Sequence, residues 1–256
     1  MQAEMHVAET GRARLAYFDL APARNERGTV LLLHGFASNA KVNWLNTGWT
    51  DVLRDAGYRV IAVDQRGHGA SEKFYDAADY GPDIFAEDAH ALLDNLGLER
   101  VHVLGFSMGA RVTAWFASHH GDRVGRAVLG GMGDHIFGGR GNHDAIIHAL
   151  TTDAPDEIEQ PAAKSFRTFA DRTGSDRHAL AACISPSAAR LTPAMIEAID
   201  CPVLVVVGDR DEIAGRAEPL VAMMKQGRAV TLPGLDHMRS TGATGFKEAV
   251  VGFLNE

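Results

Sequence analysis

Short apolar runs alternate with amphipathic stretches along most of this chain. A nearly continuous apolar run of this kind is typical of a strand buried on both faces of a sheet. Such strands are predicted at residues 29–33, 58–63, 101–105, 124–129, 202–208 and 229–232. Helices are predicted at residues 50–56, 84–96, 108–118, 219–225 and 245–254. At the N-terminus, polar–apolar alternation over residues 5–9 and 14–18 predicts an antiparallel hairpin. Strands alternating with helices indicate a parallel sheet with helices on both faces and right-handed crossovers.

The stretch from residue 134 to about residue 193 breaks this rhythm, because it contains helical patches and no apolar strand run. Its helices are predicted at residues 143–150, 162–170 and 177–183. At roughly 100–200 residues per domain, a chain of this length is one large domain or two small ones. We therefore predict one α/β core, residues 1–133 and 194–256, with residues 134–193 inserted as a helical cap.

Composition and charge narrow the class of protein. The chain is 46% hydrophobic and 23% charged, which is ordinary for a globular protein and argues against wholesale disorder. Its 25 basic and 33 acidic residues give a net charge of −8, so neither nucleic acid nor an anionic membrane is expected as a partner. The sequence also lacks a run of ~20 apolar residues and a secretory pattern. With two cysteines, Cys183 and Cys201, we expect no disulfide framework and a reduced, cytoplasmic protein, with Cys201 buried.

The strongest chemical signal is Gly105-Phe106-Ser107-Met108-Gly109, between a predicted strand and a predicted helix. This is the context of a nucleophile elbow, in which the chain turns from strand to helix within about one residue. The turn strains the backbone of Ser107, and flanking glycines avoid clashes across it. The Ser107 hydroxyl is then exposed at the carboxyl edge of the sheet, beside a helix N-terminus that favours negative charge.

A serine hydroxyl needs a base to take its proton, and a carboxylate to hold that base. We expect His237 to be the base, because it follows the last strand at the edge where open α/β sheets bind ligands. Asp211, just beyond the preceding strand, is the favoured acid. Asp209 and Asp134 remain alternatives, because each also follows a predicted strand.

A tetrahedral oxyanion needs two preorganised N–H donors. The Met108 N–H, directly after Ser107, is the first expected donor. The second is expected in the loop after the strand at 29–33, and we choose the Phe36 N–H. His34, in the same loop, is expected to be a structural histidine that hydrogen-bonds locally.

Other motifs are interpreted as scaffold. The segment Asp64-Gln65-Arg66-Gly67-His68-Gly69-Ala70-Ser71 is expected to be structural, with a local ion pair between Arg66 and Asp64. The glycine-rich stretch at 138–141 follows no strand and lacks the ending of a phosphate-binding loop. No dinucleotide fingerprint and no set of residues at metal-ligand spacing is found, so neither a cofactor nor a metal is expected.

Together these residues resemble the α/β-hydrolase-fold superfamily. The motifs that carry the resemblance are His34-Gly35-Phe36, Asp64 to Gly69, Gly105 to Gly109, Gly208-Asp209-Arg210-Asp211 and His237. The resemblance implies an eight-stranded, mostly parallel sheet with an antiparallel second strand and a cap over the site. It implies a nucleophile at Ser107, an acid at Asp211 and a base at His237, without a cofactor. Ser107 argues against the relatives that carry aspartate at the elbow.

The leading expectation is a serine hydrolase that cleaves a small or medium carboxylic ester through an acyl-enzyme. Apolar residues near the predicted site favour an apolar acyl or alcohol group, with core packing as the alternative role for the Met and Phe positions: Phe36, Phe106, Met108, Ile136 and Phe137. The same triad serves carbon–carbon bond hydrolysis in diketone-type substrates, and lactone and thioester hydrolysis, which stay open. A ligand receptor that keeps the fold without catalysis is the alternative from another class of protein.

Overall fold

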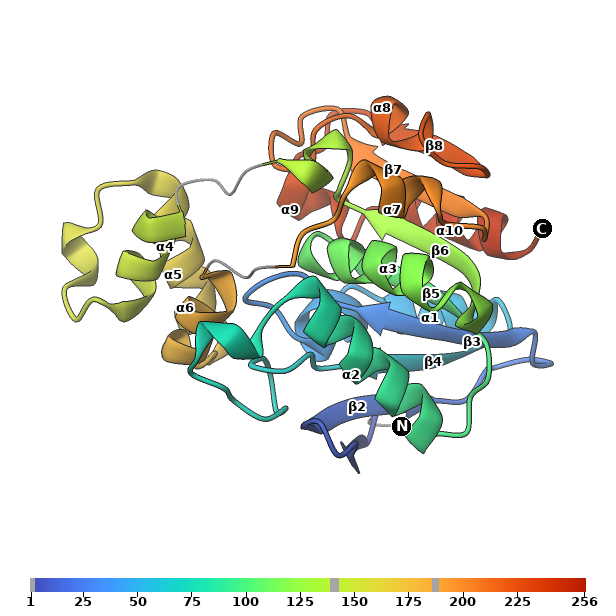
Figure 1. Cartoon of the computed structure of the whole chain (residues 1–256), viewed down its shortest axis with the longest axis horizontal. Coiled ribbons are helices and arrows are strands. Elements are labelled where there is room, and N and C mark those ends of the chain that lie inside the picture. Colours follow the sequence, from blue (N-terminus) through green and yellow to red (C-terminus); the bar gives the residue numbers. More distant parts are fainter. Residues whose placement is uncertain (1–2, 139–142, 186–188) are drawn as a thin grey trace.

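The computed structural model describes residues 3–138, 143–185 and 189–256. Gly139, Arg140 and Gly141 of the glycine-rich stretch lie outside these residues. Within the described chain, one sheet of eight strands has the order β1-β2-β4-β3-β5-β6-β7-β8 (Figure 1). The strands are β1 Met5–Glu9, β2 Arg14–Leu20, β3 Gly28–Leu33, β4 Tyr58–Val63, β5 Val101–Phe106, β6 Val124–Gly130, β7 Val203–Gly208 and β8 Gly227–Leu232. Strand β2 is antiparallel to β1 and β4, and β4, β3, β5, β6, β7 and β8 are mutually parallel. The predicted fold class is confirmed.

Helices cover both faces of the sheet. The helices that pack on it are α1 Trp49–Asp55, α2 Pro82–Asn95, α3 Met108–His119, α8 Ala217–Val221 and α10 Thr244–Leu254. Because side chains alternate along a strand, Leu31 and Leu33 of β3 pack on the face covered by α2, α3 and α8. Val30 and Leu32 pack on the face covered by α1 and α10. This alternation explains why the central strands are apolar throughout, as the sequence pattern predicts.

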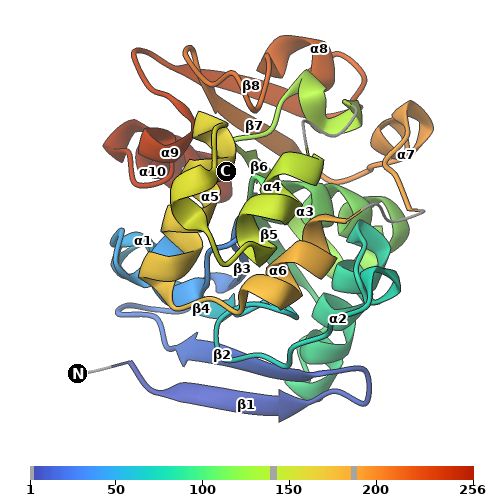
Figure 2. The ribbon, with the colours of Figure 1, turned by 90° about the vertical axis from the view of Figure 1, so that its left-hand side faces the viewer.

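Three of the helices between β6 and β7 are called the cap helices below: α4 His143–Thr151, α5 Pro161–Thr173 and α6 Arg177–Ile184. Figure 1 shows them beyond one edge of the sheet, and Figure 2 shows them in front of the ends of the central strands. Strand β6 leads into this segment from its carboxyl end. The cap helices therefore lie over the edge at which β3, β5, β7 and β8 also end.

Most predicted elements are found, with shifts of one to three residues at some ends. The helix predicted at 219–225 is misplaced, because α8 runs from Ala217 to Val221. Pro219 is the third residue of α8, a position where a missing N–H breaks no hydrogen bond within the helix. The short helices α7 Pro193–Glu197 and α9 His237–Ser240 were not predicted. Each begins after a residue whose side chain caps the helix, Thr192 for α7 and Asp236 for α9. These capping residues were the sequence signal that could have predicted the two helix starts.

Candidate active site

Ser107 occupies the sharp turn between β5 and α3. Its backbone has φ 54° and ψ −109°, a left-handed conformation that is strained for a residue with a side chain. The flanking glycines have no room for a side chain. A Cβ on Gly105 would collide with the Gly109 carbonyl, and one on Gly109 would collide with the Leu33 carbonyl of β3. The strand, the turn and the helix are therefore packed so closely that Ser107 is held at the edge of the sheet.

His237 connects Ser107 to a buried carboxylate. Its Nε2 lies 3.0 Å from Ser107 Oγ, and its Nδ1 lies 2.8 Å and 3.0 Å from Asp211 Oδ2 and Oδ1. The Asp211 side chain is fully buried, and Oδ1 also accepts the N–H groups of Ile213 (3.1 Å) and Ala214 (2.8 Å). Because a carboxylate accepts from Nδ1–H, the bonding assigns the Nδ1 proton and leaves the Nε2 lone pair toward Ser107.

The two alternative acids have other partners. Asp209 Oδ1 accepts the Gly234 N–H (2.7 Å), and Asp134 Oδ1 accepts the Arg216 N–H (2.7 Å). Both carboxylates therefore hold loops at the edge of the sheet. Asp211 is therefore the carboxylate that contacts His237, whereas Asp209 and Asp134 accept hydrogen bonds from backbone N–H groups.

A glycine beside the imidazole leaves room for the His237 ring. Gly131, just after β6, has φ +60°, and a Cβ there would meet the Phe106 ring at 2.7 Å and His237 Cε1 at 3.1 Å. The Phe106 ring packs against the imidazole with 5.1 Å between centroids. The Ser107 N–H donates to the Gly130 carbonyl (2.8 Å), which ties the elbow to the neighbouring strand.

The loop after β3 forms a β-turn beside the elbow. The Ser38 N–H donates to the Gly35 carbonyl (3.2 Å), and Ala37 at the third position of the turn has φ 59°. A Cβ on Gly35 would lie 3.6 Å from Ser107 Cβ, so this turn borders the serine. Carbonyl and N–H of one peptide point in opposite directions, so fixing the Gly35 carbonyl also fixes the Phe36 N–H. Among the described residues, the Phe36 N–H has no acceptor.

His34 is a structural histidine, as predicted. Its Nδ1 donates to the Gly35 carbonyl (2.8 Å), and its Nε2 accepts the Gln65 N–H (3.0 Å). The ring is completely buried, and burial lowers its pKa to about 4 although the hydrogen bond to Gly35 acts in the opposite direction. His34 is therefore neutral near pH 7, the form that this pair of bonds requires.

The segment after β4 is structural, but the predicted ion pair within it is wrong. Arg66 donates to Asp88 of α2, at 2.5 Å from Nε and 2.7 Å from Nη2. Asp64 instead accepts the N–H groups of Ala40 and Ala70, both at 2.8 Å. The carboxylate of Asp64 is thus occupied by backbone amides of two loops, which leaves Arg66 to pair with the next helix.

The cap helices bring apolar groups to the elbow and to the turn beside it. The Phe166 ring of α5 meets the Phe36 ring edge-on at 5.6 Å, and Cys183 Sγ of α6 lies 4.0 Å from Met108 Sδ. Burial raises the pKa of the Cys183 thiol, which keeps it uncharged. The sequence analysis missed Phe166 and Cys183 as neighbours of the site. The amphipathic spacing of their helices indicates that each helix buries one face. It does not indicate which part of the fold that face packs against.

Two residues of the expected apolar set, Ile136 and Phe137, are packing residues. Ile136 is fully buried in the core on one face of the sheet, and Phe137 packs partly buried against the same core. Phe106 is also buried, between the imidazole and the ring of Phe246. Of the expected apolar set, Phe36 and Met108 are the ones that are partly exposed beside Ser107.

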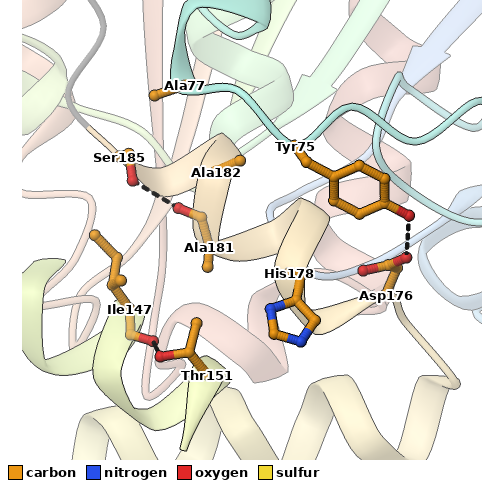
Figure 3. Close-up of a pocket in the computed structure, with 9 residues that line it drawn as sticks. All are labelled: Tyr75, Ala77, Ile147, Thr151, Asp176, His178, Ala181, Ala182 and Ser185. Atoms are coloured by element: carbon orange, nitrogen blue, oxygen red, sulfur yellow. Dashed lines mark hydrogen bonds between the residues drawn. The ribbon is translucent and has the colours of Figure 1, made fainter.

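A cavity of about 650 Å³ lies against the cap helices (Figure 3). Its lining comes from α4, α6 and the loop after β4: Tyr75, Ala77, Ile147, Thr151, Asp176, His178, Ala181, Ala182 and Ser185. Tyr75 donates to Asp176 (2.9 Å) at one side of the cavity, and this bond joins the loop to the N-terminus of α6. Ser107, Asp211 and His237 are not part of the lining.

Two other kinds of site are absent from the described residues. No cluster of three or more His, Cys, Asp or Glu side chains there is arranged to bind a metal ion. No helix within residues 3–138, 143–185 and 189–256 is long and apolar enough to cross a membrane. Cys183 and Cys201 are both free thiols, and Cys201 is buried as predicted.

Comparison with known families agrees with the fold. The family model of the alpha/beta hydrolase fold matches residues 28–173, which is more than half of the chain. This chain belongs to the alpha/beta hydrolase fold family. The matched segment contains Phe36, Ser107 and Met108, whereas Asp211 and His237 lie beyond it.

Curated relatives of this family member match over part of their length. A putative non-heme chloroperoxidase of Synechocystis is 42% identical over 39% of this chain and 35% of its own length. A 2-hydroxy-6-oxononadienedioate/2-hydroxy-6-oxononatrienedioate hydrolase of Paraburkholderia phymatum is 36% identical over 50% of this chain and 44% of its own. The chain thus spans less than half the length of these two relatives.

Solved structures with the alpha/beta hydrolase fold match this chain over nearly its whole length. A hydrolase from Pseudomonas aeruginosa has a TM-score of 0.72 and 25% identity, with 100% of each chain covered. An esterase from Thermogutta terrifontis has a TM-score of 0.73 and 24% identity, covering 99% of this chain and 98% of the other. At this level of identity, the second likeness carries the fold alone.

Proposed function

We propose that this chain is a serine hydrolase that cleaves small or medium carboxylic esters. The observation that carries the proposal is the connected chain of hydrogen bonds from Ser107 Oγ through His237 to Asp211. Strain at Ser107 supports it, because strained backbone persists where the surrounding structure over-determines it and clusters at active sites. Residues 134–193 are proposed to act as the cap over this site.

The proposed reaction follows from the assigned protons. Ser107 Oγ attacks the ester carbonyl carbon while its proton passes to the Nε2 lone pair of His237. Asp211 accepts from Nδ1–H and stabilises the imidazolium that forms. The carbonyl oxygen becomes an oxyanion that accepts from the N–H groups of Phe36 and Met108. The Met108 N–H is available, because it begins α3 and has no carbonyl one turn before it within the helix.

The second half of the reaction reverses these transfers. His237 gives its proton to the leaving alcohol as the tetrahedral intermediate collapses to an acyl-enzyme on Ser107. A water molecule then loses a proton to Nε2 and attacks the acyl carbon, which releases the acid and restores the Ser107 hydroxyl. Atoms and charge balance with water as the sole co-reactant, and no cofactor is required.

The partly exposed apolar side chains beside Ser107 support an apolar acyl or alcohol group. Phe36 and Met108 come from the core, and Phe166 and Cys183 approach them from the cap helices. We extend the proposal to a small-molecule substrate and, because both cysteines are free thiols, to a reducing cytoplasmic location.

Carbon–carbon bond hydrolysis is the second candidate. The Paraburkholderia phymatum relative named for such a substrate class is 36% identical to this chain over half of its residues. The Thermogutta terrifontis esterase is 24% identical over 99% of the chain. The substrate in the name of the Paraburkholderia phymatum relative is a dicarboxylate. The side chains of Phe36, Met108, Phe166 and Cys183 near the elbow are uncharged, and this favours the uncharged ester for the present chain.

The deciding experiment combines a substrate panel with a covalent probe. We expect turnover of nitrophenyl esters of short acyl chains, and labelling by a fluorophosphonate that is lost in Ser107→Ala while the variant stays folded. Turnover of a dienoate diketone without ester turnover selects carbon–carbon hydrolysis instead, and turnover confined to a lactone or thioester selects those classes. A folded wild-type protein that the probe fails to label favours a non-catalytic ligand receptor.

A further inference from the structure

The turn that carries the Phe36 N–H is strained one residue later. Among the described residues, Ala37 and Ser107 are the non-glycine residues with positive φ, at 59° and 54°. The third position of this kind of turn requires positive φ and usually holds glycine. An alanine keeps that conformation when its surroundings hold it there. Ala37 is therefore held by its neighbours, and its conformation fixes the relative orientation of the peptides on its two sides.

The cap helices surround this turn. Ala37 is completely buried in a small hydrophobic cluster that is separate from the two cores on the sheet. The cluster contains Ala37, Leu150, Ala170, Leu180 and Ala181, with Phe36, Ile146, Ile147 and Phe169 packed against it. Every member other than Phe36 and Ala37 belongs to α4, α5 or α6. The turn beside the serine thus packs as part of the core of the cap helices.

Two hydroxyls from the cap also reach the strained residue. Thr173 Oγ1, at the end of α5, lies 3.4 Å from the Ala37 carbonyl oxygen and also 2.9 Å and 3.1 Å from the carbonyl oxygens of Phe169 and Ala170 in its own helix. Ser175 Oγ lies 3.5 Å from the Ala37 carbonyl oxygen. The two hydroxyls are 2.8 Å from each other. Bonds of this length are weak individually. Each hydroxyl has one proton, so while one hydroxyl donates to the other, one proton of the pair remains for the Ala37 carbonyl, which is enclosed by apolar side chains where competing water is excluded.

We propose that the cap positions the oxyanion donor of the active site, with Thr173 and Ser175 as positioning residues for Ala37. Release of Ala37 toward negative φ breaks the turn bond from the Ser38 N–H to the Gly35 carbonyl. The Gly35–Phe36 peptide, which carries the Phe36 N–H, then keeps one bond, from His34 Nδ1 to the Gly35 carbonyl, and is less firmly oriented toward the oxyanion. This inference rests on the proposed function, because the donor matters when Ser107 forms a tetrahedral intermediate.

The test removes the hydroxyls and keeps the volume. In Thr173→Val/Ser175→Ala, we expect kcat for a nitrophenyl ester to fall about tenfold with KM nearly unchanged, because a displaced donor weakens transition-state binding. The rate of labelling by the fluorophosphonate should fall in parallel, since that adduct also places an oxygen at the donors. Thr173→Ser, which keeps the hydroxyl, should restore most of the loss at that position.

Matched controls lie on the same helix. Thr168→Val and Ser165→Ala remove exposed hydroxyls that bond to the carbonyls of Lys164 and Pro161 in α5, and both should leave kcat unchanged. If the double variant unfolds, Ser175→Ala alone carries the test, because Ser175 lies outside any helix.

Each outcome decides the proposal. A folded double variant with wild-type kcat, or with raised KM and unchanged kcat, overturns the positioning role alone. A wild-type protein that neither hydrolyses esters nor reacts with the probe overturns the proposed function, and this inference with it.

Discussion

Substitution of the buried acid offers the sharpest test of the proton assignments. In Asp211→Asn, the side-chain amide oxygen is expected to keep the place of Oδ1, because that oxygen accepts the N–H groups of Ile213 and Ala214. The amide NH₂ then takes the place of Oδ2, which lies 2.8 Å from His237 Nδ1. The nearer of the two side-chain atoms that face Nδ1 is then a donor, which favours the imidazole with its proton on Nε2.

The expected loss follows from this change of tautomer. With a proton on Nε2, His237 cannot accept the proton of Ser107. A wrong tautomer in a serine triad lowers kcat by about 10⁴-fold, or about 5.5 kcal/mol of activation free energy. The unfolding midpoint should stay close to that of the wild type, because both backbone N–H groups keep an acceptor.

The assay is a stopped-flow measurement of the acylation burst with a nitrophenyl ester, with a thermal melt on the same samples. Asp209→Asn and Asp134→Asn are matched controls, since their carboxylates accept from the N–H groups of Gly234 and Arg216 and do not contact His237. Their burst rates should equal that of the wild type. A folded Asp211→Asn variant that keeps most of the wild-type rate, or a control that loses as much, refutes the assignment.

Two further predictions concern stability. Arg66→Met removes the hydrogen-bonded partner of the buried Asp88 carboxylate and leaves it with Arg12, which is partly exposed and 3.9 Å away; we expect a loss of about 3 kcal/mol in urea unfolding, and a loss near zero contradicts the buried pair. Burial lowers the pKa of His34 to about 4 and that of His68 to about 3, below the ordinary value of 6.5, so both are neutral in the fold. Their contribution is present above pH 6.5 and is lost as the pH falls toward these values, by about 2 kcal/mol each at pH 5. Urea unfolding at pH 7 and pH 5 measures the loss, and equal stability at the two pH values rules out buried neutral rings.

Local pattern determined what was predictable in the fold. The strand at 58–63 was predicted to the residue, because an apolar run bounded by Gly57 and Asp64 allows little else. The helix predicted at 219–225 was misplaced because Pro219 was taken as the first residue of a helix, although proline is tolerated anywhere in the first turn. Short helices such as α9 carry too few residues for a periodic signal.

The site residues that directly follow a strand were predictable, because the strand end fixes the edge of the sheet at which they lie. Ser107, Asp211 and His237 each follow a strand that ends at the same edge, and the structure brings them together. The choice among Asp211, Asp209 and Asp134 needed side-chain directions, which depend on contacts with distant backbone amides. The approach of Phe166 to Phe36 joins residues far apart in the chain, and no local pattern contains it.

The shared packing of Phe36 and Ala37 with the cap helices bears on protein engineering. Designers exchange inserted segments between homologues to alter substrate preference, on the assumption that the catalytic frame is left untouched. Here a transplanted segment meets two frame residues shaped for the original helices. A chimera whose residues at these two positions also come from the homologue that supplies the insertion should preserve turnover better than one that exchanges the insertion alone.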